Sequence, residues 1–217
     1  MRYLLLLIPV LFAVLHYLTG KYPFSALVTI SCAVCCFFAQ AGVSMWIVAA
    51  YLLSVIGDYF MAHSDGKNGD KMLLGGISGF FCAHVCFFVY SLFSSLLFQP
   101  GDAFPYIRTA VCLLLIVVYA AFLGKQLLPA VEERFLKIGA AVYACISLLV
   151  MTSSLLYAVP TLSAALFVSG IACIMISDTI IAYSRFLKVK KWNRLICPLY
   201  FACHILVAGS VFALPSP

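Results

Sequence analysis

Eight long runs of apolar residues occupy most of this sequence, and they restrict the fold to one that a lipid bilayer can accommodate. A helix that crosses the hydrocarbon core needs about 20 mainly apolar residues, within a range of roughly 17 to 25. The runs that meet this requirement are residues 3–19, 24–41, 43–63, 72–98, 106–128, 138–159, 162–183 and 195–214. We therefore predict an all-α fold, a polytopic membrane helix bundle with about eight transmembrane helices.

The composition excludes a water-soluble domain. Charged residues make up only 9% of the 217 residues and hydrophobic residues 65%, with a mean hydropathy of +1.15. A soluble domain has about a quarter of its residues charged, so this chain could not cover a surface that faces water. Residues 1–217 are expected to form a single integral membrane domain. Only Gln40 and Gly42 separate the second run from the third, so a seven-helix arrangement is the alternative.

Basic residues are divided unequally between the two sides of the eight-helix layout. The side of the N-terminus holds Arg2 and Arg108. The opposite side holds the other eleven of the 13 basic residues, which are Lys21, Lys67, Lys71, Lys125, Arg134, Lys137, Arg185, Lys188, Lys190, Lys191 and Arg194. Cytoplasmic loops carry an excess of Lys and Arg. We therefore predict that the opposite side is cytoplasmic and that both termini are non-cytoplasmic.

Two aspartates, Asp58 and Asp178, lie inside otherwise apolar runs, whereas the other acidic residues fall in predicted loops. A carboxylate near the bilayer centre costs about 2.5–3.5 kcal/mol on insertion scales, so a function is expected for both, with a hydrogen bond that packs two helices together as the alternative. Each lies about five residues from the cytoplasmic end of its helix, roughly 7–8 Å deep at 1.5 Å per residue. Because the two helices run in the same direction, one bundle could bring the carboxyl groups together.

A histidine follows each aspartate at the same spacing. His84 comes 26 residues after Asp58, and His204 comes 26 residues after Asp178. This spacing predicts that the helix pair 43–63 and 72–98 is repeated as 162–183 and 195–214, related by a pseudo-two-fold axis along the membrane normal. Each histidine is a candidate ligand or proton carrier, with an interhelical hydrogen bond as the alternative.

Four polar residues near this cluster are expected to support the site or to bind substrate. Ser54 lies one helical turn before the first aspartate, and Tyr200 lies one turn before the second histidine. Residues four apart share a helix face. Ser177 and Tyr183 flank the second aspartate on its own helix.

The basic loop 184–193, followed by Arg194, contains Trp192 and has two interpretations. Basic residues beside an interfacial tryptophan are typical of a segment that contacts anionic lipid head groups. Alternatively, Arg185 could hold a phosphate of the substrate.

Several motifs together resemble those of the YhhN family of multi-spanning membrane proteins, whose characterised members are lysoplasmalogenases. The matching residues are Ser54, Gly57 and Asp58 in SVIGD, Gly76, Phe80 and His84 in GxxxFxxxH, Ser177, Asp178, Ala182, Arg185 and Phe186 in SDxxIAxxRF, and Tyr200 in YFACH. Their order and the eight-helix layout extend the resemblance over essentially the whole chain. The family commonly has glutamine where this chain has His204.

The resemblance implies hydrolysis of the vinyl ether bond of a 1-alkenyl lysophospholipid, which gives a fatty aldehyde and a glycerophospho-alcohol. Such a reaction starts with proton transfer to the alkene carbon and forms an oxocarbenium ion, to which water adds. One protonated carboxyl group and one carboxylate are required. Two nearby carboxyl groups in a low dielectric cannot both ionise easily, so Asp58 and Asp178 fit these roles as a pair. His84 could relay protons or orient the water.

Two other functions remain open. His84, His204, Asp58 and Asp178 have the nitrogen and oxygen donors of a zinc site, as in a metal-dependent intramembrane lipid hydrolase. Intramembrane Asp and His residues with a parallel repeat are also expected in a proton-coupled transporter.

The lysoplasmalogenase interpretation requires no metal or other cofactor. Its expected partners are a lysophospholipid substrate and membrane lipids, with no nucleic acid. The expected location is a bacterial cell membrane, or the endoplasmic reticulum if the source is eukaryotic.

Overall fold

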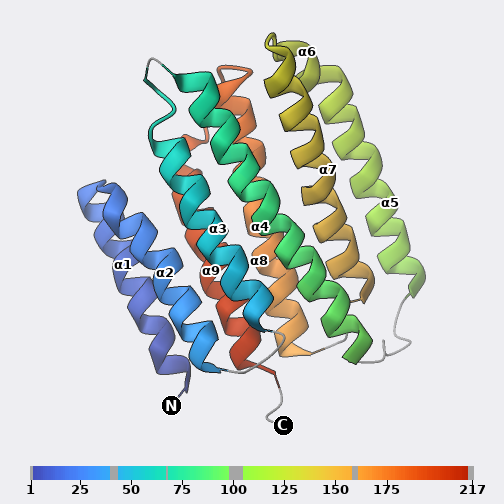
Figure 1. Ribbon diagram of the computed structural model, residues 1–217. Helices are drawn as coiled ribbons and strands as arrows, with labels where there is room; N and C mark the ends of the chain where they lie inside the picture. The colour runs from blue at the N-terminus through green and yellow to red at the C-terminus, as the bar shows by residue number, and fades with distance from the viewer. Residues whose placement is uncertain (1, 40–43, 67, 98–104, 158–160, 215–217) are drawn as a thin grey trace.

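A computed structural model describes residues 2–39, 44–66, 68–97, 105–157 and 161–214, and these residues form helices joined by short turns. The helices in chain order are η1 (Arg2–Leu6), α1 (Leu7–Thr19), α2 (Tyr22–Ala39), α3 (Ser44–Ala62), α4 (Gly69–Leu97), α5 (Pro105–Phe122), η2 (Leu123–Leu127), α6 (Leu128–Ala130), α7 (Arg134–Tyr157), α8 (Leu162–Arg185), η3 (Asn193–Leu195) and α9 (Ile196–Phe212). Since η1 runs into α1, α5 into η2 and α6, and η3 into α9, the described chain contains eight long helical segments (Figure 1).

This arrangement confirms the predicted polytopic helix bundle. Seven of the described helices are long and apolar enough to cross a membrane, and the first segment, Tyr3–Thr19, is a shorter apolar helix. The separation of the second and third runs is also confirmed, because α2 ends at Ala39 and α3 begins at Ser44. Gln40 and Gly42, where the boundary was predicted, lie outside the described residues.

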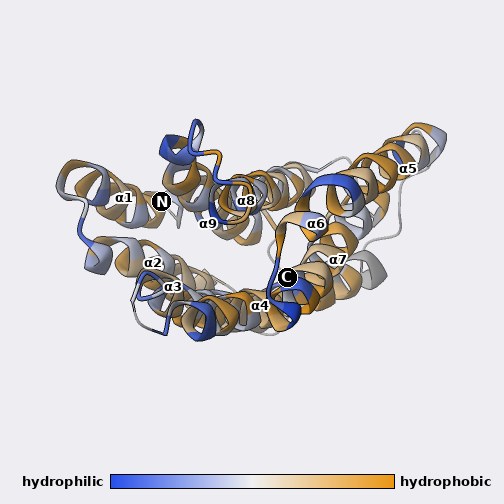
Figure 2. Cartoon of the chain, turned by 90° about the horizontal axis from the view of Figure 1, so that it is seen from above, coloured by the Kyte–Doolittle hydropathy of each residue, from blue (hydrophilic) through white to orange (hydrophobic). Residues whose placement is uncertain are grey.

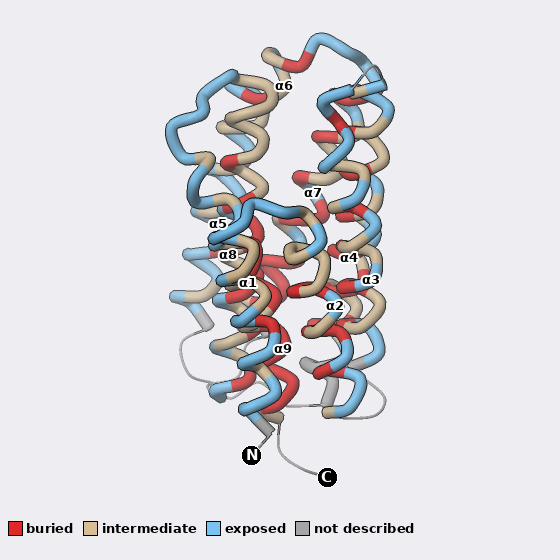
Figure 3. The backbone as a smooth tube through the Cα atoms, turned by 90° about the vertical axis from the view of Figure 1, so that its left-hand side faces the viewer, coloured by how far each residue is buried: buried red, intermediate tan, exposed pale blue. Residues whose placement is uncertain are grey.

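Seen from above, the helices form two rows (Figure 2). One row contains α1, α9 and α8, the other contains α2, α3, α4 and α7, and α5 lies at the edge beyond α7. Buried positions concentrate on the inward-facing sides of the helices (Figure 3). Large apolar side chains on the outer sides are exposed, including Leu113, Leu114 and Val117 of α5, as expected for a surface that faces lipid.

Glycines allow close contacts within the two helix pairs that the sequence suggested as a repeat. A Cβ atom at Gly79 of α4 would lie only 2.9 Å from the Cα atom of Gly57 in α3. A Cβ atom at Gly170 of α8 would lie 2.7 Å from the side chain of Val207 in α9. Small residues at such contacts let helix backbones approach closely. The helices of the pairs α3–α4 and α8–α9 are therefore closely packed.

The two ends of the bundle differ in charge. The first helical segment begins and α9 ends at the same end of the bundle (Figure 1), where Arg108 also lies near the start of α5. Ten described basic residues lie at or near the opposite end: Lys21, Lys71, Lys125, Arg134, Lys137, Arg185, Lys188, Lys190, Lys191 and Arg194. Lys67 lies outside the described residues. We call this opposite end the basic end.

Candidate functional site

A cavity of about 550 Å³ lies at the basic end of the bundle and reaches down between α2, α3, α4, α8 and α9. Asp58 of α3 and Asp178 of α8 both line it. Arg185, Lys188 and Lys190 line it as well, at the end of α8 and in the turn that follows. The cavity therefore combines two carboxyl groups within the bundle with cationic side chains near its mouth, and we call it the aspartate cavity.

Asp58 is held by a tyrosine from another helix. The hydroxyl of Tyr200, on α9, donates a hydrogen bond to Oδ2 of Asp58 at 2.8 Å. Asp58 is followed by one more turn of α3, which ends at Ala62. It thus lies close to the basic end, as the sequence predicted.

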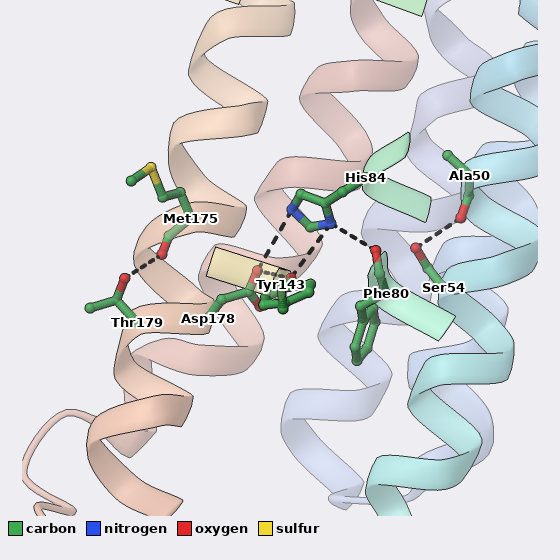
Figure 4. Close-up of polar contacts among 8 residues, drawn as sticks. All are labelled: Ala50, Ser54, Phe80, His84, Tyr143, Met175, Asp178 and Thr179. Carbon is green, nitrogen blue, oxygen red and sulfur yellow. Dashed lines mark hydrogen bonds and ion pairs between the residues drawn. The ribbon is translucent and has the colours of Figure 1, made fainter. Parts of the chain in front are cut away.

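Asp178 has a matching tyrosine and a histidine beside it (Figure 4). The hydroxyl of Tyr143, on α7, donates a short hydrogen bond to Oδ2 of Asp178. Nε2 of His84, on α4, lies 3.9 Å from the same oxygen. Three helices therefore place a carboxyl group, a phenol and an imidazole in contact, in a part of the bundle where the histidine is fully buried.

The hydrogen bonding of His84 indicates which ring nitrogen faces the site. Nδ1 lies 2.9 Å from the backbone oxygen of Phe80, one turn earlier on α4. A backbone carbonyl oxygen can only accept a hydrogen bond, so Nδ1 carries the proton in the neutral ring. Nε2 then has a free lone pair toward Asp178, and it has no hydrogen-bond partner among the described residues. His84 can accept a proton at that nitrogen.

The two serines predicted at the site have structural contacts instead. The hydroxyl of Ser54 donates to the backbone oxygen of Ala50 on its own helix (Figure 4). The hydroxyl of Ser177 donates to the backbone oxygen of Ile196 at 3.1 Å and so joins α8 to the start of α9. Neither serine lines the aspartate cavity.

His204 and Tyr183 also lie apart from the two carboxyl groups. The His204 ring packs on the rings of Tyr200 and Tyr51, with centroids 4.4 and 5.0 Å away. Both its nitrogens are buried without a hydrogen-bond partner in the described chain. The hydroxyl of Tyr183 instead donates to Gln126 at 2.8 Å, on the side of α8 that faces α5. His204 can support Tyr200 through packing, whereas Tyr183 belongs to another surface.

The four-residue zinc site considered from the sequence is not assembled. The described residues contain no group of three or more His, Cys, Asp or Glu side chains placed to hold a metal ion. His84 and Asp178 come together, but His204 contacts the two tyrosines instead.

Arg185 lies at the mouth of the aspartate cavity and is bound to the turn between α3 and α4. Its guanidinium donates to Oδ1 of Asp65 at 2.5 Å and to the hydroxyl of Ser64 at 2.6 Å. The Arg185 guanidinium lowers the pKa of Asp65 below its ordinary value, with a smaller contribution from Lys190. Lys188 donates from Nζ to the backbone oxygen of Arg185 at 3.0 Å. Three cations and one exposed carboxylate therefore share this mouth.

Sequence reasoning missed three of these residues. No motif marks Tyr143, because a single tyrosine in an apolar helix has no diagnostic spacing. Ser64 and Asp65 were assigned only to a polar loop, although Asp65 lies 120 residues before its partner Arg185. That contact depends on where the turn after α3 lies relative to the end of α8, which the sequence alone does not give.

The motifs identified in the sequence fall within a larger family match. The model of the YhhN family matches residues 6–211, nearly the whole chain. The chain belongs to the YhhN family. The match includes α2, α3, α4, α8 and most of α9, the helices that surround the aspartate cavity. The comparison with curated proteins and the comparison with solved structures gave no match.

Proposed function

We propose that this YhhN protein is a membrane hydrolase that cleaves the vinyl ether bond of lysoplasmalogens, 1-alkenyl-glycerophosphoethanolamine or -choline. The observation that carries the proposal is the aspartate cavity, which joins two carboxyl groups from different helices to a cationic mouth. The products are a fatty aldehyde and the glycerophospho-alcohol. Family membership is consistent with this reaction.

The cavity suits the shape of such a substrate. A lysophospholipid places its phosphate at the membrane interface and its chain in the hydrocarbon, with the vinyl ether close to the glycerol. Arg185, Lys188 and Lys190 line the mouth, where a phosphate would be attracted. Arginine is especially suited to phosphate because its planar guanidinium can donate two hydrogen bonds at once. Asp58 and Asp178 would then face the glycerol end of the chain.

Two carboxyl groups can perform each proton transfer of the hydrolysis. The protonated carboxyl group gives its proton to the second carbon of the vinyl ether. The first carbon, which carries the ether oxygen, becomes part of an oxocarbenium ion, and the ionised carboxyl group stabilises this cation. The ionised group takes a proton from water as the water oxygen bonds to the first carbon. The resulting hemiacetal loses its alcohol, which receives a proton as the C–O bond breaks, while the hemiacetal hydroxyl proton returns to the protein. The net reaction consumes one water.

The neighbouring side chains would keep this pair in position. Tyr200 and Tyr143 each donate to one carboxyl group and so restrict its rotation. His84 would accept or return a proton at Nε2 beside Asp178. Since the two carboxyl groups share one cavity, they are expected to titrate as a unit, and the acid and the base are not assigned individually.

The test is incubation of the purified protein with an alkenyl lysophospholipid and, separately, with its acyl analogue. Aldehyde release from the first without fatty acid release from the second is the expected result. We expect Asp58→Asn and Asp178→Asn each to abolish aldehyde release while the protein still inserts and folds. Asparagine has a similar shape but cannot transfer these protons. Near-normal aldehyde release by either variant would remove that aspartate from the mechanism.

The same preparation separates hydrolysis from transport. A proton-coupled transporter would move a solute across liposome membranes without forming a product. Flux without aldehyde would therefore contradict the hydrolase proposal.

We further propose that the basic end faces the cytoplasm, in a bacterial cell membrane or, in a eukaryote, in the endoplasmic reticulum. The support is the excess of basic residues at that end, which the positive-inside rule assigns to the cytoplasmic side.

A further inference from the structure

A second, smaller space adjoins the aspartate cavity on the side of α7. This pocket of about 70 Å³ lies between α4, α5, α7 and α8 and is lined mainly by apolar side chains, such as Leu73, Ile77 and Ala144. Asp178 and Tyr143 line it too. Asp178 therefore borders both spaces, the polar one toward the basic end and the apolar one toward α5.

A larger hollow of about 650 Å³ lies on the outer side of α8, between α8 and α5. Its walls are apolar over most of their length, and Lys125, Gln126, Tyr183 and Trp192 line it as well. The helix α5 packs mainly against α7 and is the least buried of the seven helices long enough to span a membrane. The hollow therefore opens where a membrane-spanning protein meets lipid.

One side chain belongs to the walls of both apolar spaces. Tyr119 of α5 lines the small pocket beside Asp178 and also the outer hollow. Thr179 of α8, the residue after Asp178, lines the outer hollow opposite α5, and its hydroxyl donates to the backbone oxygen of Met175. Figure 4 shows that Thr179 and Asp178 extend from different sides of the same helix, Asp178 toward His84 and Thr179 away from it. Tyr119 thus stands between the small pocket beside the Asp178 carboxyl group and the outer hollow.

We propose that the hydrocarbon chain of the lipid substrate leaves the aspartate cavity past Tyr119 and lies in the hollow between α5 and α8. This inference rests on the proposed function for the identity of the lipid. The phosphate would stay at the cationic mouth, and the vinyl ether bond would lie beside Asp178. The hydrocarbon chain would continue between apolar side chains to the bilayer. The occupant is a lipid chain because the route is apolar and ends at the lipid-facing surface.

The residues that border the outer hollow near the membrane surface also support a lipid chain as its ligand. Trp192 and Lys125 border the hollow near the basic end, and tryptophan and lysine are common where a protein meets the membrane interface. A substrate whose chain lies in this hollow would therefore be held at the depth where its head group meets water. It could enter sideways from the bilayer and would not need to leave the membrane.

Chain-length selectivity tests this route. In Ala121→Trp, a large ring would fill the hollow, because Ala121 is exposed and lines it. We expect kcat/KM for a long-chain alkenyl lysophospholipid to fall about tenfold, which corresponds to about 1.4 kcal/mol, while a short-chain analogue is cleaved as before. Ala120→Trp is the matched control, since Ala120 is the neighbouring exposed alanine and does not line the hollow.

Tyr119→Trp and Tyr119→Ala test the role of the side chain that separates the two apolar spaces. The larger ring should reduce cleavage of long chains more than of short chains, and alanine should lessen the discrimination between them. Equal effects of Ala121→Trp on both chain lengths, or the same effect of Ala120→Trp, would overturn the route.

A binding measurement keeps the route separate from the proposed reaction. A lysophospholipid with a photoreactive group at the end of its chain is irradiated with the full-length protein in vesicles, and the labelled peptides are identified by mass spectrometry. We expect labels on residues of α5 and α8 that line the hollow. Labelling of these residues without any aldehyde release would support the proposed path of the lipid chain and contradict the proposed vinyl ether hydrolysis. Aldehyde release with labels confined to α1, α2 or α9 would contradict the proposed path of the lipid chain and support the proposed hydrolysis.

Discussion

The aspartates of the candidate site have related surroundings. Tyr200 donates a hydrogen bond to Asp58, and Tyr143 donates one to Asp178. In each case the tyrosine comes from a helix other than the one that carries the aspartate. A phenol in this position can hold a carboxyl group in one orientation and still leave its second oxygen for a reactant. Only Asp178 has a histidine beside it, so the two carboxyl groups are not equivalent.

The contribution of the Tyr143 hydroxyl can be measured by removing it alone. We expect Tyr143→Phe to lower kcat for aldehyde release by about ten- to a hundredfold, within the usual range for a proton-transfer network, with a smaller change in KM. Phenylalanine keeps the ring between Asp178 and His84 but no longer fixes the carboxyl group. Steady-state kinetics with detergent-solubilised protein provide the measurement.

Tyr51→Phe is the control for this variant. Tyr51 is also a buried tyrosine, and its hydroxyl donates to the backbone oxygen of His204 at 2.7 Å. Removing that hydroxyl should lower thermal stability by an amount typical of one hydrogen bond, about 1 kcal/mol, and should leave kcat nearly unchanged. Equal losses of kcat in both variants would show that Tyr143 acts only through folding.

The sequence predicted the acidic members of the site better than their partners. A carboxylate in an apolar run is costly, so Asp58 and Asp178 are conspicuous without any structure, and both line the same cavity. Tyr143 carries no such cost and could not be distinguished from the other tyrosines. The equal spacing of His84 and His204 suggested equal roles, yet His84 contacts Asp178 while His204 packs on tyrosine rings.

At the scale of elements, the turn between α3 and α4 is tied to the end of α8. Arg185 contacts Asp65 and Ser64 of this turn while it lines the mouth of the aspartate cavity. A substrate phosphate and the Asp65 carboxylate would therefore compete for the same guanidinium. Because the pKa of Asp65 is lowered from 3.8, this carboxylate stays ionised at neutral pH and the competition persists there.

This competition predicts the effect of neutralising Asp65. We expect Asp65→Asn to lower KM for an alkenyl lysophospholipid about two- to fivefold, because an exposed ion pair is only a weak competitor for the guanidinium, with kcat little changed. Arg185→Gln should raise KM. Initial rates over a range of substrate concentrations in mixed micelles measure both effects.

Asp70→Asn is the matched control, since Asp70 is an exposed aspartate in the first turn of α4 and does not line the cavity. It removes the same charge from the same end of the protein. An identical fall in KM in Asp70→Asn would mean that net charge, and not release of Arg185, explains the result.

The helices themselves were predictable to within a few residues, but their lateral packing was not. Length and hydropathy locate each span because the bilayer sets the required number of apolar residues. They give no information on which helices are neighbours. The outer hollow exists because α5 packs on α7 and leaves a gap to α8, and a lipid-facing helix such as α5 has no sequence pattern that reveals this gap.

For the whole molecule, the distribution of charge and the position of the site are linked. The cationic mouth of the aspartate cavity is part of the basic end that the positive-inside rule assigns to the cytoplasm. If the site opens there, the proposed hydrolase would draw its substrate from the cytoplasmic leaflet and release the glycerophospho-alcohol into the cytoplasm. The orientation of the bundle therefore decides which pool of lipid is accessible.

Reporter fusions test this orientation. In bacteria, we expect alkaline phosphatase fused after the C-terminus to be active and green fluorescent protein fused there to be dark, because only the phosphatase folds outside the cytoplasm. A reporter inserted after Gly66, in the turn between α3 and α4, should give the opposite result. Cytoplasmic signals at the C-terminus would contradict the orientation and place the mouth of the cavity on the outer side. In that case the positive charge at the mouth would have to be explained by binding to phosphate rather than by topology.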